Sequence, residues 1–355
     1  VTRKRDSDEI GHAFRVTELL LRWCKKSFMA ILSAIASRNP LLLGPDSRAV
    51  QERPVTCAHC GAKLRVNQLD YDCKKDKLPA ELADKFVKLD GDADTKEYID
   101  RCLNRPRVYR HVMGHLARLL RMFFSRTTAN GILNKGGMFV MSKAQASKLL
   151  GRDESDHSHG ALLDVGAGDG KVTENLLPLY KQVVVTETSF SMVHRLRQSG
   201  KYAAVVGTGD VSVVAKAARK QGVALSGPNR NQFDGLVLFN VLDRCDAPLT
   251  LLRHLKRMLV PNTGRLLMAV VLPFRPFVES GTKRTPPKEK LGLNPDADFE
   301  TSLKDLYEKV LKPEGFIVEQ VSRLPYLCEG EFDCPMFTLD DAVLTLSVRD
   351  HTVPF

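Results

Sequence analysis

The chain has 355 residues, of which 43% are hydrophobic, with a mean hydropathy of −0.19 and a formal net charge of +11. It can bury a large core, and no apolar stretch approaches the roughly 20 residues that cross a bilayer. Its eight cysteines do not indicate a disulfide scaffold, because a core of this size needs no covalent staples. The positive charge is scattered, with few aromatic residues nearby, so we expect a solvated surface and no nucleic-acid partner.

Residues 1–78 are predicted to be a partly disordered N-terminal extension. Helix-like pieces within 10–36 include an apolar stretch that resembles a fragment of a targeting segment, which leaves the compartment open. Further on, Cys57, Cys60 and Cys73 resemble a zinc knuckle that lacks its fourth ligand. The alternative is a loop with free thiols, so we assign no metal site.

Residues 79–150 are predicted to form a helical lid and a loop that closes over a cofactor. Apolar residues recur at helical spacing in 78–89 and in 95–124, as on a helix that packs against another domain. The predicted buried face of the second stretch comprises Val108, Val112, His115, Leu116, Leu119, Leu120, Phe123 and Phe124, with Arg110, Arg118 and Arg121 outside it. Residues 125–140 are rich in glycine and small polar side chains, which predicts a loop and not a helix.

The second half of the chain is organised around residues 162–170, with the sequence LLDVGAGDG. An apolar run, an acid and three alternating glycines before a helix-like segment predict a buried strand that turns sharply toward a ligand-binding helix N-terminus. A dinucleotide fingerprint would need glycine at position 171, where Lys171 stands. The D-x-G-x-G-x-G pattern instead resembles the first motif of class I S-adenosylmethionine methyltransferases. The candidate cofactor-binding residues of this loop are Asp164, Gly166, Ala167, Gly168 and Gly170.

Two later acids are further candidates for cofactor binding. Glu187 ends a second apolar run about twenty residues after the glycines, where a βαβ nucleotide fold places the carboxylate that binds the ribose hydroxyls. The alternative is a strand that merely ends in a surface acid. Asp210 follows a third predicted strand, 203–207, at the position that commonly meets the adenine in such folds.

Strands and helices then alternate as a doubly wound sheet requires. The remaining predicted strands are 233–239, 265–272, 315–321 and 341–348, and the predicted helices are 191–198, 247–259 and 303–311. A stretch rich in Gly, Pro and Asn within 211–232 predicts a surface insertion. We therefore predict an α/β, Rossmann-like class I methyltransferase fold, with a mostly parallel seven-stranded sheet in a catalytic domain over residues 151–355.

Ligands of such sheets bind at the carboxyl ends of the strands. Four loop tips would meet there: 164–170, Glu187, 240–246, and 323–330 between the last two strands. The candidate catalytic residues on these tips are Asn240, Asp243 and Tyr326, and Asn240 is also a cofactor candidate. For Asp243 the alternative is an acid at the N-terminus of the helix that follows.

Several longer strings carry a more specific resemblance. They are F-S-R-T-T-A-N-G at 124–131, N-V-L-D-R-C-D at 240–246, V-L-P-F-R-P-F-V-E at 271–279 and R-L-P-Y-L-C-E-G at 323–330. Over roughly residues 105–350 the chain thereby resembles the DREV family. The resemblance implies a protein-histidine methyltransferase that uses S-adenosylmethionine and methylates the pros nitrogen, Nδ1, in His-x-His motifs with small x. The rival interpretations are a methyltransferase of RNA or a small metabolite, and a fold that has lost catalysis.

Protein substrates that carry His-x-His motifs are therefore the expected partners. In the implied chemistry Asp243 would accept the Nε2–H of the target imidazole, Asn240 would orient the ring or the cofactor, and Tyr326 would hold the substrate. The chain itself contains His157-Ser158-His159 in an acidic stretch, so methylation between molecules is a hypothesis. The alternative is a solvated linker that carries two histidines by chance.

Overall fold

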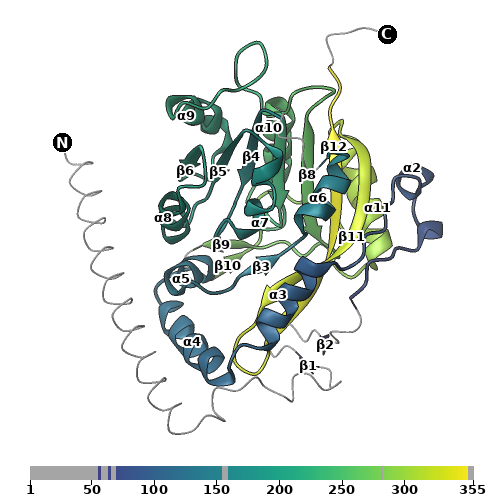
Figure 1. The fold of residues 1–355 in the computed structure, drawn as a ribbon. Helices are drawn as coiled ribbons and strands as arrows, with labels where there is room; N and C mark the ends of the chain where they lie inside the picture. The colour runs from purple at the N-terminus through teal and green to yellow at the C-terminus, as the bar shows by residue number, and fades with distance from the viewer. Residues whose placement is uncertain (1–54, 57–62, 65–68, 154–158, 281–282, 351–355) are drawn as a thin grey trace.

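The computed structural model describes residues 69–153, 159–280 and 283–350, together with 55–56 and 63–64 (Figure 1). The zinc-knuckle candidates Cys57 and Cys60 lie outside the described residues, as do most of the predicted extension and the histidine at position 157. Cys73 is described, and it packs in the main hydrophobic core beside Leu82. Within the described part of the chain, no helix is both long and apolar enough to span a membrane.

The centre of the molecule is an eight-stranded sheet in the order β3-β11-β12-β8-β7-β4-β5-β6 (Figure 1). The pairs from β8 through β7, β4 and β5 to β6 are parallel, and the pairs from β3 to β8 are antiparallel. The strands are β3 (Met138–Phe139), β4 (Ala161–Val165), β5 (Gln182–Thr186), β6 (Ala204–Val206), β7 (Gly235–Phe239), β8 (Arg265–Val271), β11 (Ile317–Glu329) and β12 (Met336–Ser347). This arrangement confirms the predicted doubly wound, Rossmann-like α/β fold.

Two short antiparallel hairpins stand apart from the sheet. They pair β1 (Val55–Thr56) with β2 (Lys63–Leu64), and β9 (Val278–Ser280) with β10 (Lys283–Thr285). The second hairpin follows β8 and lies close to helix α5 (Arg126–Leu133), where the Thr127 hydroxyl donates to a Glu279 carboxylate oxygen over 3.3 Å. It therefore contributes to the rim above the carboxyl ends of the strands.

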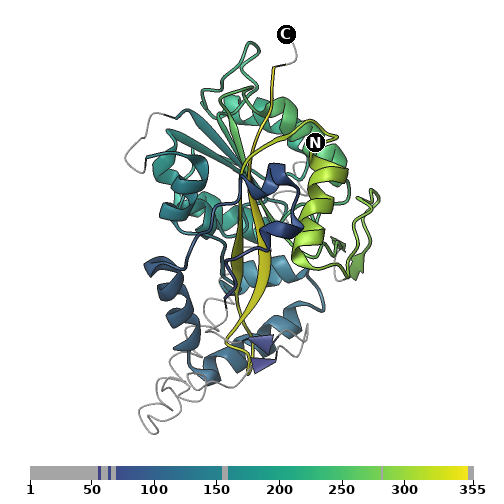
Figure 2. The ribbon, with the colours of Figure 1, turned by 90° about the vertical axis from the view of Figure 1, so that its right-hand side faces the viewer.

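Helices cover both faces of the sheet, which is seen nearly edge-on in Figure 2. They are α2 (Ala80–Ala83), α3 (Ala93–Leu103), α4 (Arg107–Leu120), α5, α6 (Lys143–Leu150), α7 (Lys171–Glu174), α8 (Phe190–Ser199), α9 (Val214–Lys220), α10 (Pro248–Met258) and α11 (Phe299–Leu306), with short turns η2 (Lys75–Lys77), η3 (Leu177–Leu179), η4 (Val211–Val213) and η5 (Tyr307–Leu311). Helices α9, α10 and α11 bury one face of the sheet, and α6, α7 and α8 bury the other.

The alternation of side chains along β4 shows why both faces are buried. Leu163 and Val165 belong to the core under α9, α10 and α11, while Leu162 belongs to the core on the opposite face. Successive side chains of a strand point to opposite faces, so a central parallel strand is apolar along its whole length. The polar exception in β4 is Asp164, and it marks the site.

Three sequence-based predictions about the sheet are wrong. The sheet has eight strands and not seven, because the backbone of Met138 and Phe139 adds β3 to the edge of β11. Residues 323–330 do not form a loop tip, since β11 continues through them to Glu329 in one hairpin with β12. The predicted insertion 211–232 carries η4 and α9, which pack into the core, and its Gly- and Asn-rich exposed turn is confined to about 227–231.

The predicted long helix over 95–124 is two helices, α3 and α4, which separate at Asn104 and Pro106. Its predicted buried face is also wrong, because Leu119 is 56% and Phe123 is 74% exposed. The other face, with the buried Arg110, packs on the hairpin of β11 and β12: a side chain at Gly114 would lie 2.8 Å from the Phe332 ring.

Arg110 is buried because main-chain oxygens solvate its guanidinium. It donates to the carbonyl oxygens of Phe332 over 2.9 Å and of Arg105 over 2.6 Å. Charge-assisted bonds of this kind offset the desolvation of the cation. The helical pattern over 78–89 also yields only one turn, α2, before Phe86 forms a bridge with Val321.

The predicted loop at 125–133 is helix α5. The Ser125 hydroxyl accepts from the Thr128 N–H over 3.2 Å, and Asn134 ends the helix in the left-handed conformation at a φ of 51°. These are a standard helix start and stop. The small residues that resembled a loop instead let α5 approach α8, where a Cβ at Gly131 would lie 2.3 Å from the Ser191 hydroxyl oxygen.

Candidate active site

The glycine loop after β4 leaves no room for side chains at two of its turns. Gly166 has a φ of +79°, and a Cβ there would lie 2.6 Å from Cγ2 of Val241. Gly170 has a φ of +81°, and a Cβ would lie 2.2 Å from the Tyr202 hydroxyl oxygen. Left-handed backbone and close neighbours together require glycine. The loop is a main-chain surface fixed between β4 and α7.

Asp164 lies beneath this loop and is completely buried. The Thr173 hydroxyl donates to its Oδ2 atom over 2.5 Å, which ties β4 to α7. Burial raises the pKa of Asp164 to about 7, although the Thr173 bond opposes the rise. Glu187 contributes to the rise through its negative charge.

Glu187, directly after β5, is only 7% exposed, so the surface-acid alternative is wrong. Its Oε1 atom accepts from the N–H groups of Thr188 and Ser189, each over 2.8 Å, and its Oε2 accepts from the Gly168 N–H over 3.0 Å. The carboxylate thus joins the glycine loop to the start of α8. Three N–H donors therefore fix the orientation of this carboxylate, and its role in binding ribose hydroxyls stays a prediction.

Asp210 stands at the carboxyl end of β6, on the same edge of the sheet, but it is exposed. The Oδ1 atom of Asp210 accepts from the Ser212 N–H over 2.9 Å and from the Ser212 hydroxyl over 2.6 Å, so Asp210 caps the turn η4. These bonds lower the pKa of Asp210. The adenine-binding role stays a prediction.

Asn240 occupies a strained position immediately after β7. Its φ is +54°, which asparagine tolerates better than most residues. Its N–H donates to the Ala269 carbonyl oxygen over 2.9 Å, and its side-chain amide donates to Oδ2 of Asp341 over 2.8 Å. The Oδ1 atom of Asn240 is buried and has no hydrogen-bond partner within the described part of the chain.

Asp243 is 2% exposed, and one of its carboxylate oxygens is unused. Oδ2 lies 3.0 Å from the Arg244 guanidinium, whereas Oδ1 has no partner among the described residues. Burial raises the pKa of Asp243 to about 6, and Arg244 opposes that rise. The capping alternative is wrong, because α10 starts at Pro248 after Ala247 and no side chain caps it.

Tyr326 reaches the site from β11, not from a loop. Its buried hydroxyl donates to the sulfur of Met138 on β3, and burial raises the pKa of the phenol well above its usual value. Negative charge on Cys328, Asp341 and Asp243 adds to that rise. The phenol is therefore a neutral donor at any physiological pH.

A small cavity of about 30 Å³ brings together five of the ten predicted site residues. Its lining consists of Met138, Val140, Asp164, Gly166, Ala167, Val172, Phe239, Asn240 and Tyr326. The other five predicted site residues do not line it: Glu187 is bonded to Gly168 of the glycine loop, Asp243 follows Asn240 by three residues, and Gly170 and Asp210 stand at the starts of α7 and η4. The described residues hold no group of three His, Cys, Asp or Glu side chains that could bind a metal ion.

Sequence reasoning missed Asp341 and Met138. Asp341 is fully buried on β12, and burial raises its pKa well above the usual value. The available signal was an acid at the start of the apolar run 341–348, although acids at strand ends usually face water. Met138 gave no signal beyond an apolar residue in a glycine-rich segment.

Most of the chain matches one known protein family. The model of the DREV methyltransferase family matches residues 70–348. The chain belongs to the DREV methyltransferase family. It is an S-adenosylmethionine-dependent methyltransferase, as the predicted DREV resemblance implied. The matched range includes α3 to α6 and β3 as well as the sheet, whereas the sequence-based resemblance began near residue 105.

Solved structures similar to this DREV protein are remote. A putative RNA methyltransferase from Pyrococcus horikoshii is 16% identical, with 59% of this chain and 84% of that chain covered and a TM-score of 0.37. A methyltransferase from Leishmania major is 15% identical over 66% and 82%, with a TM-score of 0.37. Magnesium protoporphyrin IX methyltransferase from Synechocystis PCC 6803 is 15% identical over 59% and 78%, with a TM-score of 0.35.

The residues present fit S-adenosylmethionine, the cofactor of this DREV enzyme. Gly166 and Ala167 of the glycine loop line the cavity, and Asn240 supplies a buried acceptor oxygen. Glu187 holds a carboxylate at the end of the adjacent strand β5. Bound there, the cofactor supplies an electrophilic methyl group.

Proposed function

We propose that this DREV methyltransferase methylates the Nδ1 atom of histidine in His-x-His motifs of proteins, where x is small. The observation that supports this assignment most directly is the pair of unpartnered, buried acceptor oxygens on Asn240 and Asp243. A buried acceptor without a donor is unfavourable in the free protein. A substrate that brings an N–H donor removes that penalty on binding, and a neutral imidazole brings one such donor.

The acceptors would determine which imidazole nitrogen reacts. When the carboxylate of Asp243 accepts the Nε2–H, the proton is fixed on Nε2 and the lone pair is fixed on Nδ1. The same carboxylate stabilises the positive charge that the ring gains as Nδ1 is alkylated. The imidazole needs no prior deprotonation, so placement of the ring dominates the rate.

Asn240 and Tyr326 would define the position of the ring. Asp341 holds the amide nitrogen of Asn240, and this leaves the Asn240 oxygen as the free acceptor. Tyr326 presents a neutral hydroxyl on the cavity wall formed by β11.

The decisive experiment is an assay on a His-Ala-His peptide with S-adenosylmethionine. We expect a gain of one methyl group by mass spectrometry. Hydrolysis and chromatography against both methylhistidine standards should then show the Nδ1 isomer. Binding of the cofactor without any methylation of the peptide would contradict the histidine assignment and favour RNA or a small metabolite.

We also propose that the chain's own His157-Ser158-His159 is methylated between molecules. His159 lies just before β4, at the amino ends of the parallel strands, whereas the cavity lies at their carboxyl ends. Transfer within one molecule is therefore disfavoured. Intact-mass analysis after incubation with S-adenosylmethionine, in the parent and in His157→Ala and His159→Ala, tests the idea. No mass gain in the parent protein would end it.

A further inference from the structure

Two arginines enclose the ring of Phe277 beside the candidate catalytic acid. The guanidinium carbons of Arg244 and Arg284 lie 3.8 Å and 4.0 Å from the ring centroid. The Phe277 N–H donates to the Asp243 carbonyl oxygen over 3.0 Å, so this stack is attached to the acid that would hold the imidazole. Stacking on an aromatic ring holds a guanidinium in place without neutralising it.

A third arginine, Arg126, approaches the same place from the first turn of α5. It is half-buried, and it has neither a hydrogen bond nor an ion pair among the described residues. Burial lowers the pKa of Arg126, the nearby charges of Arg121 and Arg284 lower it further, and the charges of Glu331 and Glu279 oppose the fall. Burying a cation without a direct partner is unfavourable, and the described residues offer Arg126 neither a hydrogen bond nor an ion pair.

The carboxylates nearby are largely occupied. Glu331 already pairs with Arg121 and with Lys135, and Glu279 accepts from the Thr127 hydroxyl and lies opposite Arg284 in the β9–β10 hairpin. Asp243 pairs with Arg244. Arg284, which is exposed, has no ion pair within the described part of the chain. The rim above the site therefore has an excess of positive charge, supplied by Arg126 and Arg284.

We propose that Arg126 and Arg284 form a carboxylate-binding subsite that selects an acidic residue next to the target histidine. This inference rests on the proposed function, and it specifies which His-x-His sequences the enzyme prefers. Guanidinium groups bind carboxylates through paired, charge-assisted hydrogen bonds. Arg284 stacks on the Phe277 ring, whose N–H is bonded to the Asp243 main chain, so the recognised side chain belongs to the same short peptide segment as the target histidine.

Residues 153–159 of the chain supply a suitable probe, because their sequence Asp-Glu-Ser-Asp-His-Ser-His places acids directly before the motif. The comparison peptide is Asn-Gln-Ser-Asn-His-Ser-His, which keeps the shape and removes the charge. For the parent enzyme we expect KM for the acidic peptide to be lower by about fivefold or more, which corresponds to one favourable exposed ion pair. The preference should weaken as salt is added.

The preference should depend on the two arginines and on no others. In Arg126→Gln and in Arg284→Gln we expect the ratio of the two KM values to approach one while kcat changes little. In Arg284→Glu we expect the order to reverse in favour of a Lys-Lys-Ser-Lys-His-Ser-His peptide. The matched control is Arg219→Glu, an exposed arginine on α9 that should preserve the parental preference.

Each remaining outcome has a defined meaning. Equal KM values for the acidic and neutral peptides in an active parent enzyme overturn the subsite. A rise in KM for S-adenosylmethionine instead of the peptide in Arg126→Gln also overturns it, because the carboxylate would then be the cofactor's own. Calorimetric binding of both peptides gives the preference independently of turnover, so a preference without methylation contradicts the proposed reaction and supports the subsite.

Discussion

The residues of the candidate site bury polar atoms before any ligand arrives. Asn240, Asp243 and Asp341 each keep one side-chain oxygen without a partner in the described part of the chain, although most buried polar atoms in proteins are hydrogen-bonded. Other buried atoms of the described residues are also without a partner, but these three gather at the candidate site, where the proposed ligands would supply donors. The other side-chain atoms of these residues have different partners, Arg244 for Asp243 and Asn240 for Asp341, so each residue gives a separate prediction.

For Asp243 we expect the Asn variant to bind S-adenosylmethionine normally and to lose turnover on a His-x-His peptide by on the order of 100-fold, because charge stabilisation is lost. In the parent, both the peptide imidazole and Asp243, with a pKa of about 6, must lose a proton. The logarithm of kcat/KM should then fall below pH 6 with a slope near two, and with a slope near one in Asp243→Asn. Near-parental turnover in the variant would refute the role.

Asp341 is predicted to be a positioning residue that acts through Asn240. In Asp341→Asn the new amide can donate to Asn240 Oδ1, which removes the free acceptor, so kcat should fall by about tenfold or more. The double variant Asn240→Asp with Asp341→Asn exchanges the two groups and restores the acceptor, and it should recover most of the loss. A purely structural Asp341 would instead give lower stability in both variants and no kinetic recovery.

For Glu187 we expect the Gln variant to weaken S-adenosylmethionine binding by at least about tenfold, since charge-assisted bonds to two hydroxyls become weaker. Thermal stability should fall as well, because an amide nitrogen cannot accept the Gly168 N–H. Calorimetry on the purified variant separates the two effects. The matched control is Glu308→Gln on an exposed face, and unchanged affinity at position 187 would remove Glu187 from the cofactor site.

At the scale of elements, the sequence predicted the centre of the sheet well and its edge poorly. The strands at β4, β5, β7 and β8 are short apolar runs with clear turn signals, and they agree with the structure. The β11–β12 hairpin was the least well predicted part. Pro325 and Gly330 made residues 323–330 resemble a loop, although β11 continues past Tyr326. Whether such a segment is a strand depends on its pairing with β12 along the hairpin, and at Leu327 and Cys328 also with β3, and not on local turn signals alone.

Helix α5 was missed for a related reason, because its small residues serve packing against α8. We expect Gly131→Ala to lower the free energy of unfolding by about 1–3 kcal/mol, since the new Cβ would overlap the Ser191 hydroxyl. Ser191 donates to the Thr128 carbonyl oxygen, so the same shift would disturb a hydrogen bond between α8 and α5. Urea unfolding measures the loss of stability. Gly207→Ala, where the nearest atoms lie 3.6 Å away, is the control and should be nearly neutral.

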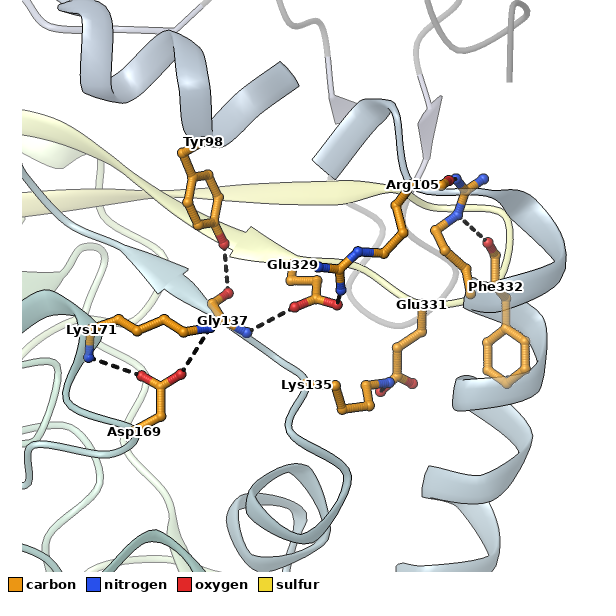
Figure 3. A network of polar contacts seen from close by, with 10 residues as sticks. Tyr98, Arg105, Lys135, Gly137, Asp169, Lys171, Glu329, Glu331 and Phe332 are labelled. Carbon is orange, nitrogen blue, oxygen red and sulfur yellow. Dashed lines mark hydrogen bonds and ion pairs between the residues drawn. The ribbon is translucent and has the colours of Figure 1, made fainter. Parts of the chain in front are cut away.

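At the scale of the whole molecule, a buried polar network joins the N-terminal helices to the catalytic sheet (Figure 3). Glu329 pairs with Arg105 and accepts the Gly137 N–H over 3.1 Å, and the Tyr98 hydroxyl donates to the Gly137 carbonyl oxygen over 2.5 Å. The predicted lid 79–150 and the catalytic domain are thus bonded at β3. The boundary between them stays a prediction, and the contacts favour one cooperative unit.

Glu331 gives the test of that coupling. Arg121 and Lys135 both bind its carboxylate and, although burial opposes them, they lower its pKa to about 2. A carboxyl with a depressed pKa stabilises the fold above its unfolded pKa, near 4.3, and loses that contribution as the pH falls toward 2. Glu331→Gln should therefore cost roughly 3 kcal/mol at pH 7, because it leaves the buried Lys135 unpaired.

The difference between parent and Glu331→Gln should stay constant from pH 8 to about 5 and shrink below about 4.3, as measured by urea unfolding at each pH. The exposed pair of Arg275 and Asp296 supplies the control, and Asp296→Asn should cost less than about 1 kcal/mol. If the helices and the sheet form one unit, near-UV and far-UV circular dichroism should report a single transition in both proteins. A separate early transition in Glu331→Gln would show that α3 to α5 unfold independently of the catalytic domain.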